Sequence, residues 1–94
     1  MKIPKRIKIG GHWFTIEYSN GDKGFRDSRF KGSWNNIIVL NKGLKQSKRE
    51  SVLLHEIIHE ISWQNDLDLK EETVSTIAEG LYQVLVDNKL LREG

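Results

Sequence analysis

Two histidines and a glutamate stand at a spacing that suits metal chemistry, in the segment His55-Glu56-Ile57-Ile58-His59. This is the H-E-x-x-H arrangement of zinc-dependent peptidases. Two His four residues apart on a helix point the same way, so both imidazoles can reach one zinc ion. Glu56 projects beside the pair, where it can take a proton from water and later pass it to a leaving amine. The motif therefore predicts zinc on His55 and His59, with Glu56 as the catalytic base.

A third metal ligand is needed, because a catalytic zinc site normally has three protein ligands and a water. The metzincin version would require Gly at position 62 and His at position 65, but the chain has Ser62 and Asn65. A glutamate from the following helix is the alternative. On a helical wheel Glu71 lies close to the apolar stripe of that helix, whereas Glu72 lies nearly opposite. We expect Glu71 to complete the site.

Other interpretations of these residues stay open at this point. Asp68 with Glu71 three residues later also fits a helix-capping pattern. Glu72 remains an alternative third ligand, and less favoured candidates are His12, Asp66 and Asp68.

The motif requires a helix, and the surrounding pattern predicts one from about Lys48 to Gln64. Ser47 with Glu50 three residues on fits a capping box at its start. One broad apolar face should pack on a sheet; it consists of Leu53, Leu54, Ile57, Ile58 and Ile61. A second amphipathic helix should end near Asn88, with a stripe of Val74, Ile77, Ala78, Leu81, Val84 and Leu85.

The first half of the chain is predicted to form β-strands. Apolar residues alternate at Ile7 and Ile9 and again from Phe14 to Tyr18, on either side of Gly10-Gly11, which predicts a β-hairpin. The polar stretch from Ser19 to Lys31 has no clear period and predicts a loop, and a third strand is expected from Trp34 to Leu40. Strands followed by helices indicate an α+β fold, with a small antiparallel three-stranded sheet and then two helices.

Length and composition narrow the class of protein. A chain of 94 residues forms a single domain over residues 1–94, and 37% apolar with 30% charged residues suits a soluble globular protein. No apolar run approaches the roughly 20 residues of a membrane span, and no apolar segment follows the basic N-terminus as in a signal peptide. We expect a cytoplasmic protein without membrane contact. Because the chain has no cysteine, any metal must be held by His and carboxylate groups.

Charge is divided unevenly along the chain. Residues 1–49 contain 12 basic and three acidic residues, a net charge of +9, whereas residues 50–94 contain three basic and ten acidic residues, a net charge of −7. The basic half could contact nucleic acid, with aromatic residues such as Trp13 available for stacking. We favour the simpler interpretation that the basic residues are solvated and that Trp and Phe at alternate positions form the core of a small sheet.

The chain also resembles a known group. The H-E-x-x-H segment, with Glu71-Glu72-Thr73-Val74 and Ile77-Ala78-Glu79-Gly80-Leu81, looks like the small phage and prophage metallopeptidase-like proteins related to the ImmA/IrrE group of gluzincins. The resemblance runs from about Ile7 to Asn88. The larger relatives have E-x-x-A where this chain has Val74 at the fourth position, and only 11 residues separate His59 from Glu71.

This resemblance implies a minimal zincin in which His55, His59 and Glu71 bind zinc and Glu56 is the base. It also implies that the strand at Trp34 to Leu40 lines the substrate cleft. Independently of the resemblance, we expect that the segment from Gly32 to Leu40 could add a substrate peptide at an open sheet edge. The expected function is a bacterial or phage-encoded zinc metallopeptidase that cleaves a peptide bond in a regulatory protein. The alternative is a non-catalytic zinc-containing module that contacts nucleic acid or a partner protein through the basic half.

Overall fold

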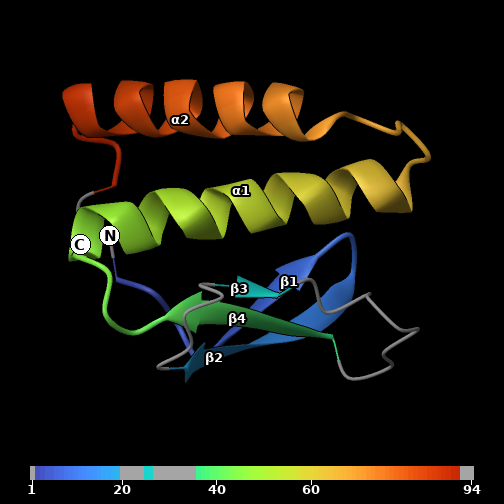
Figure 1. The fold of residues 1–94 in the computed structure, drawn as a ribbon, viewed down its shortest axis with the longest axis horizontal. Helices are drawn as coiled ribbons and strands as arrows, with labels where there is room; N and C mark the ends of the chain where they lie inside the picture. Colours follow the sequence, from blue (N-terminus) through green and yellow to red (C-terminus); the bar gives the residue numbers. More distant parts are fainter. Residues whose placement is uncertain (1, 20–24, 27–35, 92–94) are drawn as a thin grey trace.

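The structure, a computed structural model, describes residues 2–19, 25–26 and 36–91. The elements in chain order are β1 (Arg6–Ile9), β2 (His12–Ser19), β3 (Phe25–Arg26), β4 (Ile37–Asn41), α1 (Gln46–Gln64) and α2 (Glu71–Asp87). Figure 1 shows three layers, with α1 between the sheet and α2. The expected α+β fold, with a sheet followed by two helices, is confirmed.

The sheet differs from the expected antiparallel one. Its strand order is β1-β2-β4-β3, and β2 and β4 run parallel, whereas β1–β2 and β3–β4 are antiparallel. The chain between β2 and β4 is long enough for a crossover connection, which a parallel pair requires. That segment also contributes the two-residue strand β3, inside the stretch predicted as a loop; residues 20–24 and 27–35 lie outside the described part.

The predicted hairpin is present. Gly10 and Gly11 have φ angles of +58° and +85°, and a two-residue turn with both central residues at positive φ matches the twist of the flanking strands. Phe14 and Ile16 are buried on the face that packs against α1. Trp13 is 49% exposed, so the expectation that Trp and Phe together form the sheet core is wrong for Trp13, because side chains alternate across a strand.

The core lies between the sheet and α1. Its buried members are Ile9, Phe14, Ile16, Ile38, Leu40 and Leu53. Burial of this apolar surface holds the helix that carries the H-E-x-x-H segment against the sheet.

Helix α1 departs from the predicted amphipathic pattern. Its N-cap is Lys45, without a side-chain capping bond, so the capping box of Ser47 and Glu50 is wrong. Glu50 is instead buried and accepts hydrogen bonds from Gln46 Nε2 at 2.8 Å and from the hydroxyl of Tyr82 at 2.6 Å.

The burial pattern of α1 also differs from the predicted apolar face. Ile61 is 42% exposed, while three glutamates are buried, namely Glu50, Glu56 and Glu60. A helix packed on two sides has two buried faces, and a single apolar stripe describes only one of them.

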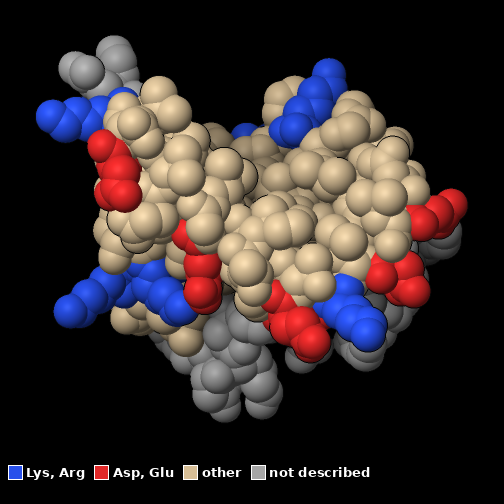
Figure 2. Space-filling model, turned by 90° about the horizontal axis from the view of Figure 1, so that it is seen from above, with Lys and Arg blue, Asp and Glu red and all other residues tan. Residues whose placement is uncertain are grey.

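Helix α2 packs on α1, on the side away from the sheet (Figure 1). Its buried residues are Val74 and Ala78. The rest of the predicted stripe is less covered, since Ile77, Leu81 and Val84 are each more than 40% exposed. Figure 2 shows that the centre of the surface on this side carries mainly uncharged residues, with Lys, Arg, Asp and Glu around it. Neither α1 nor α2 has the length and apolar character needed to cross a membrane.

Candidate metal centre

Three predicted ligands meet at one place. His55 and His59 lie one turn apart on α1, and Glu71 is the first residue of α2. The Glu71 carboxylate reaches both rings: its Oε2 lies 2.9 Å from Nε2 of His55 and its Oε1 lies 2.8 Å from Nε2 of His59. One donor atom from each residue lies within 4.8 Å of the other two. The structure therefore brings together two imidazoles and one carboxylate.

The electrostatics of the site favour neutral imidazole at His55. Burial lowers the pKa of His55, and the nearby His59 lowers it further, whereas Glu71 and Glu79 act in the opposite direction. The net effect is a pKa below the ordinary value. A neutral ring keeps a nitrogen lone pair for a metal ion, so this shift reduces competition by protons.

The donor set suits zinc. Two imidazole nitrogens with one carboxylate oxygen is a known ligand set of catalytic zinc, at about 2.0 to 2.2 Å from the metal, which places the ligand atoms about 3.3 Å from each other. The separations of 2.8 and 2.9 Å are hydrogen-bond distances, so small side-chain adjustments would admit the ion. No other group of three His, Asp or Glu donors forms such a cluster within the described ranges 2–19, 25–26 and 36–91.

The site is open on one side. The side chains of His55 and His59 are only 15% and 16% exposed, but that of Glu71 is 64% exposed. A pocket of about 220 Å³ adjoins it, lined by Lys48, Ser51, Val52, His55, Glu71, Ser75, Ala78 and Glu79. An open position beside three protein ligands is typical of catalytic zinc, because structural sites are closed by a fourth protein ligand.

The connection between the helices positions Glu71. Ser62 is buried, and its hydroxyl accepts a hydrogen bond from the backbone N–H of Leu69 at 3.1 Å. Its carbonyl accepts another from the N–H of Leu67 at 3.0 Å. Asp66 and Asp68 adopt positive φ angles of 55° and 54°, a conformation that Asp tolerates better than most residues. The short turn therefore folds back on α1, so that α2 begins opposite His59.

The alternative ligands lie outside the cluster. His12, Glu72, Asp66 and Asp68 are all exposed and are not grouped with the two histidines. The N-cap of α2 is Lys70, which makes no side-chain capping bond, so Asp68 does not cap this helix. The Glu71 side chain turns toward the histidines.

Glu56 lies on α1 between the two histidines, and it is buried, with 6% of its surface exposed. Neighbouring residues of a helix are rotated by about 100° about its axis, so Glu56 lies on a different side of α1 from His55. Glu56 is outside the three-residue cluster and is not among the residues that line the pocket.

One expectation about the substrate strand is wrong. In β4, Val39 and Leu40 pair with β2 on one side and with β3 on the other, so this part of the strand is interior and offers no open edge. Ile37 and Ile38 pair with β2, and residues 32–35 of the expected substrate segment, including Trp34, lie outside the described part.

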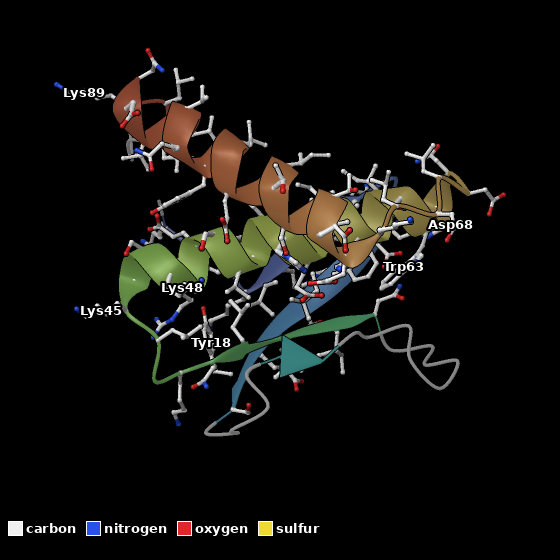
Figure 3. All side chains as sticks on the ribbon, turned by 45° about the horizontal axis from the view of Figure 1, so that its top comes forward. Tyr18, Lys45, Lys48, Trp63, Asp68 and Lys89 are labelled. Atoms are coloured by element: carbon white, nitrogen blue, oxygen red, sulfur yellow. The ribbon has the colours of Figure 1, made fainter. Side chains whose placement is uncertain are left out.

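Two further residues contact the histidines, and sequence reasoning missed both as site residues. The ring of Trp63 stacks on that of His59, with centroids 5.2 Å apart and an interplanar angle of 17°, and Figure 3 shows Trp63 close to the beginning of α2. The hydroxyl of Ser75 lies 3.5 Å from Nδ1 of His55. The available signal was the spacing of four residues, which places Trp63 one turn after His59 and Ser75 one turn after Glu71.

No family model, curated protein or solved structure matches this chain at a significant level. Its function is therefore inferred from the residues and their arrangement.

Proposed function

We propose that this protein is a zinc-dependent metallopeptidase that hydrolyses a peptide bond in a bacterial or phage regulatory protein, in the cytoplasm. The observation that carries the proposal is the meeting of Glu71 with both histidines of the H-E-x-x-H segment, beside an open pocket. The sequence resemblance to small phage metallopeptidase-like proteins related to the ImmA/IrrE group supports the same function and the regulatory substrate.

Metal binding and proton transfer are assigned to different residues in this proposal. His55, His59 and Glu71 would hold the metal, which supplies a Lewis acid that polarises a carbonyl and lowers the pKa of water. Glu56 would accept a proton from the attacking water and return it to the leaving amine.

The pocket between α1 and α2 would bind part of the substrate peptide. The pocket that contains His55 and Glu71 continues between α1 and α2 to Lys48 and Glu79. A peptide whose reacting carbonyl lies at the metal centre could therefore place a neighbouring side chain between the two helices. One helical wall on each side encloses only a short segment, which favours one defined protein substrate over general proteolysis.

Metal content is the first test. Elemental mass spectrometry of the purified protein should give about one zinc per chain, lost in His59→Ala and in Glu71→Ala. Glu72→Ala is the matched control, because it removes the same type of exposed carboxylate from the adjacent position and should keep the metal. Wild-type protein without zinc after zinc is supplied, or equal losses in both glutamate variants, would contradict the metal centre.

Activity is the second test. A quenched fluorescent peptide library should reveal zinc-dependent cleavage by the wild type, and Glu56→Gln should bind zinc and keep the fold while losing at least a hundredfold in rate. Unchanged cleavage by Glu56→Gln would exclude this mechanism. A chelator should stop cleavage, and added zinc should restore it.

A further inference from the structure

The sheet has a face that no described helix covers. Both helices lie on the other side of it (Figure 1), where Phe14, Ile16, Ile38 and Leu40 are buried. Alternation therefore sends the intervening side chains to the free face. These are Arg6 and Lys8 on β1, Trp13, Thr15 and Glu17 on β2, and Ile37 and Val39 on β4.

Trp13 is the large aromatic side chain of this face, at the second position of β2 and close to the hairpin turn. It is 49% exposed, although Trp is among the residues that are highly buried on average. The guanidinium carbon of Arg6 lies 4.2 Å from the centroid of its ring, and Nζ of Lys8 lies 5.3 Å from it. Lys8 is the direct cross-strand partner of Trp13, and Arg6 is its diagonal neighbour. The ring is thus held in place by two cations and still presents surface to solvent.

The charge around Trp13 is one-sided. Lys2, Lys5, Arg6 and Lys8 precede it in the chain and are exposed, and Glu17 is the one acidic residue of this face on β1, β2 and β4. Nothing in the proposed peptidase reaction uses these residues, because the metal centre lies across α1 from the sheet. A flat aromatic ring rimmed by cations, on a rigid β-surface, suits an anionic partner with planar groups.

From this arrangement we infer that the free face of the sheet binds single-stranded nucleic acid. A base would stack on Trp13 in place of the Arg6 guanidinium, and the displaced Arg6 together with Lys8 would contact the flanking phosphates. Ile37 is partly buried and lies opposite Thr15 on the neighbouring β4, which makes it a diagonal neighbour of Trp13 on the same face. A single strand is preferred to a duplex, because the faces of paired bases are already stacked and cannot reach Trp13. Stacking and phosphate contacts predict little dependence on base sequence.

The test is fluorescence anisotropy of a labelled oligothymidine of about 15 nucleotides, a length at the upper end of the site of one small domain. Wild-type protein should bind it with an affinity that falls as salt rises. Trp13→Ala should weaken binding roughly five- to hundredfold, the range found for loss of one base-stacking ring, and Trp13→Tyr should restore much of it. Circular dichroism and a thermal melt check that both variants remain folded.

The cations have a matched control. Arg6→Gln with Lys8→Gln should weaken binding and reduce the slope of log affinity against log salt by about 1.4, since each phosphate contact on a single strand contributes about 0.7. Lys42→Gln with Lys45→Gln removes the same charge from exposed positions in the connection between β4 and α1, and it should leave the slope nearly unchanged. Equal effects of the two double variants would overturn the inference, because they would indicate attraction by net charge alone.

Two further comparisons complete the test. A duplex of the same length should bind more weakly than the single strand, and His59→Ala, which should lose the metal, should bind the oligonucleotide like the wild type. Binding to vesicles of anionic lipid without binding to the oligonucleotide would overturn the inference in favour of a membrane surface. The metal variants are tested by zinc content and peptide cleavage, and the Trp13 variants are tested by oligonucleotide binding. Failure of the peptidase proposal would therefore not contradict nucleic-acid binding, and the reverse also holds.

Discussion

The hydroxyl of Ser62 accepts a hydrogen bond from the backbone N–H of Leu69 at 3.1 Å, deep in the angle between the two helices. Two residues later α2 begins with Glu71, whose carboxylate reaches His55 and His59. A side chain that has no direct contact with the metal centre therefore fixes the path of the chain that brings Glu71 to it.

Ser62→Ala should lower both stability and metal affinity. Loss of the buried acceptor leaves the N–H of Leu69 without this partner, a change that costs about 1 to 3 kcal/mol in the free energy of unfolding. Urea denaturation and zinc titration would measure the two effects. Ser51→Ala is the control, since the Ser51 hydroxyl bonds to the carbonyl of Lys48 within its own helix and should matter less to both quantities. A Ser62→Ala variant with wild-type zinc affinity would show that the turn holds Glu71 without this bond.

Tyr82→Phe should loosen α2 from the start of α1. The phenol donates a 2.6 Å hydrogen bond to Glu50, a residue that is only 4% exposed. The variant keeps the ring while removing one donor from this buried carboxylate. We expect a loss of about 1 to 3 kcal/mol in chemical denaturation. Gln83→Ala is the control at the next position of α2, where it removes only an exposed hydrogen bond to Asp87. It should lower the free energy of unfolding far less.

The same pair predicts how stability depends on pH. Burial raises the pKa of Glu50, but hydrogen bonds, including those from Tyr82 and Gln46, outweigh it and leave the pKa below its ordinary value. Its contribution is present above the unfolded-state pKa and is lost as pH falls through the folded-state pKa. Burial and the bond to Glu50 raise the pKa of Tyr82 from 10.0 to about 12, so that contribution is present below pH 10 and is lost as pH rises toward 12. Melting temperatures across pH should fall at both ends, and Tyr82→Phe should flatten the alkaline side.

Trp63 should report on the metal centre. Its ring stacks on His59, so addition of Co²⁺, a paramagnetic substitute for zinc, should quench its fluorescence. Trp63→Phe should remove most of this response, and Trp13→Phe should retain it, because Trp13 lies on the far face of the sheet. Trp63→Ala should also weaken metal binding by roughly tenfold, as is typical of residues that support a ligand. Quenching that persists in Trp63→Phe would place the bound ion elsewhere.

Gly10→Ala should destabilise the protein more than Gly11→Ala. Both residues have positive φ, which an alanine adopts only with strain. A Cβ at Gly10 would also collide with the side-chain amide of Gln64, whereas a Cβ at Gly11 meets nothing within 4 Å. Moving Gln64 breaks its 3.1 Å bond to the carbonyl of Ile9, at a further cost of about 1 kcal/mol. Equal melting temperatures for the two variants would show that Gln64 moves without loss.

The sequence predicted the parts of the fold that depend on local pattern. Alternation around Gly10-Gly11 was sufficient for the hairpin, and helical spacing alone places His55 beside His59. The preference for Glu71 over Glu72 came from the apolar stripe of α2, and the structure does bring Glu71 to the two histidines.

The features that were missed depend on distant contacts. The direction of β4 follows from its pairing with β2 and with Phe25–Arg26, and a two-residue strand leaves no periodic signal in a polar segment. Glu50 matched a capping box by spacing, but its carboxylate bonds to Tyr82, 32 positions away. The exposure of Trp13 was missed because an aromatic residue in a strand is usually assigned to the core, and only the register decides which face it occupies.

The ligands of the metal centre come from two helices that are held in the fold by different amounts of packing. The two histidines belong to α1, which is packed on the sheet, whereas Glu71 belongs to α2, whose main packing among the described elements is against α1. A metal ion bound by all three would tie the outer helix to the rest of the molecule, as a covalent cross-link does in chains that contain cysteine. Removal of the ion would then free α2 to open as a separate cooperative unit, and hydrogen exchange would detect this as faster exchange confined to residues 71–87.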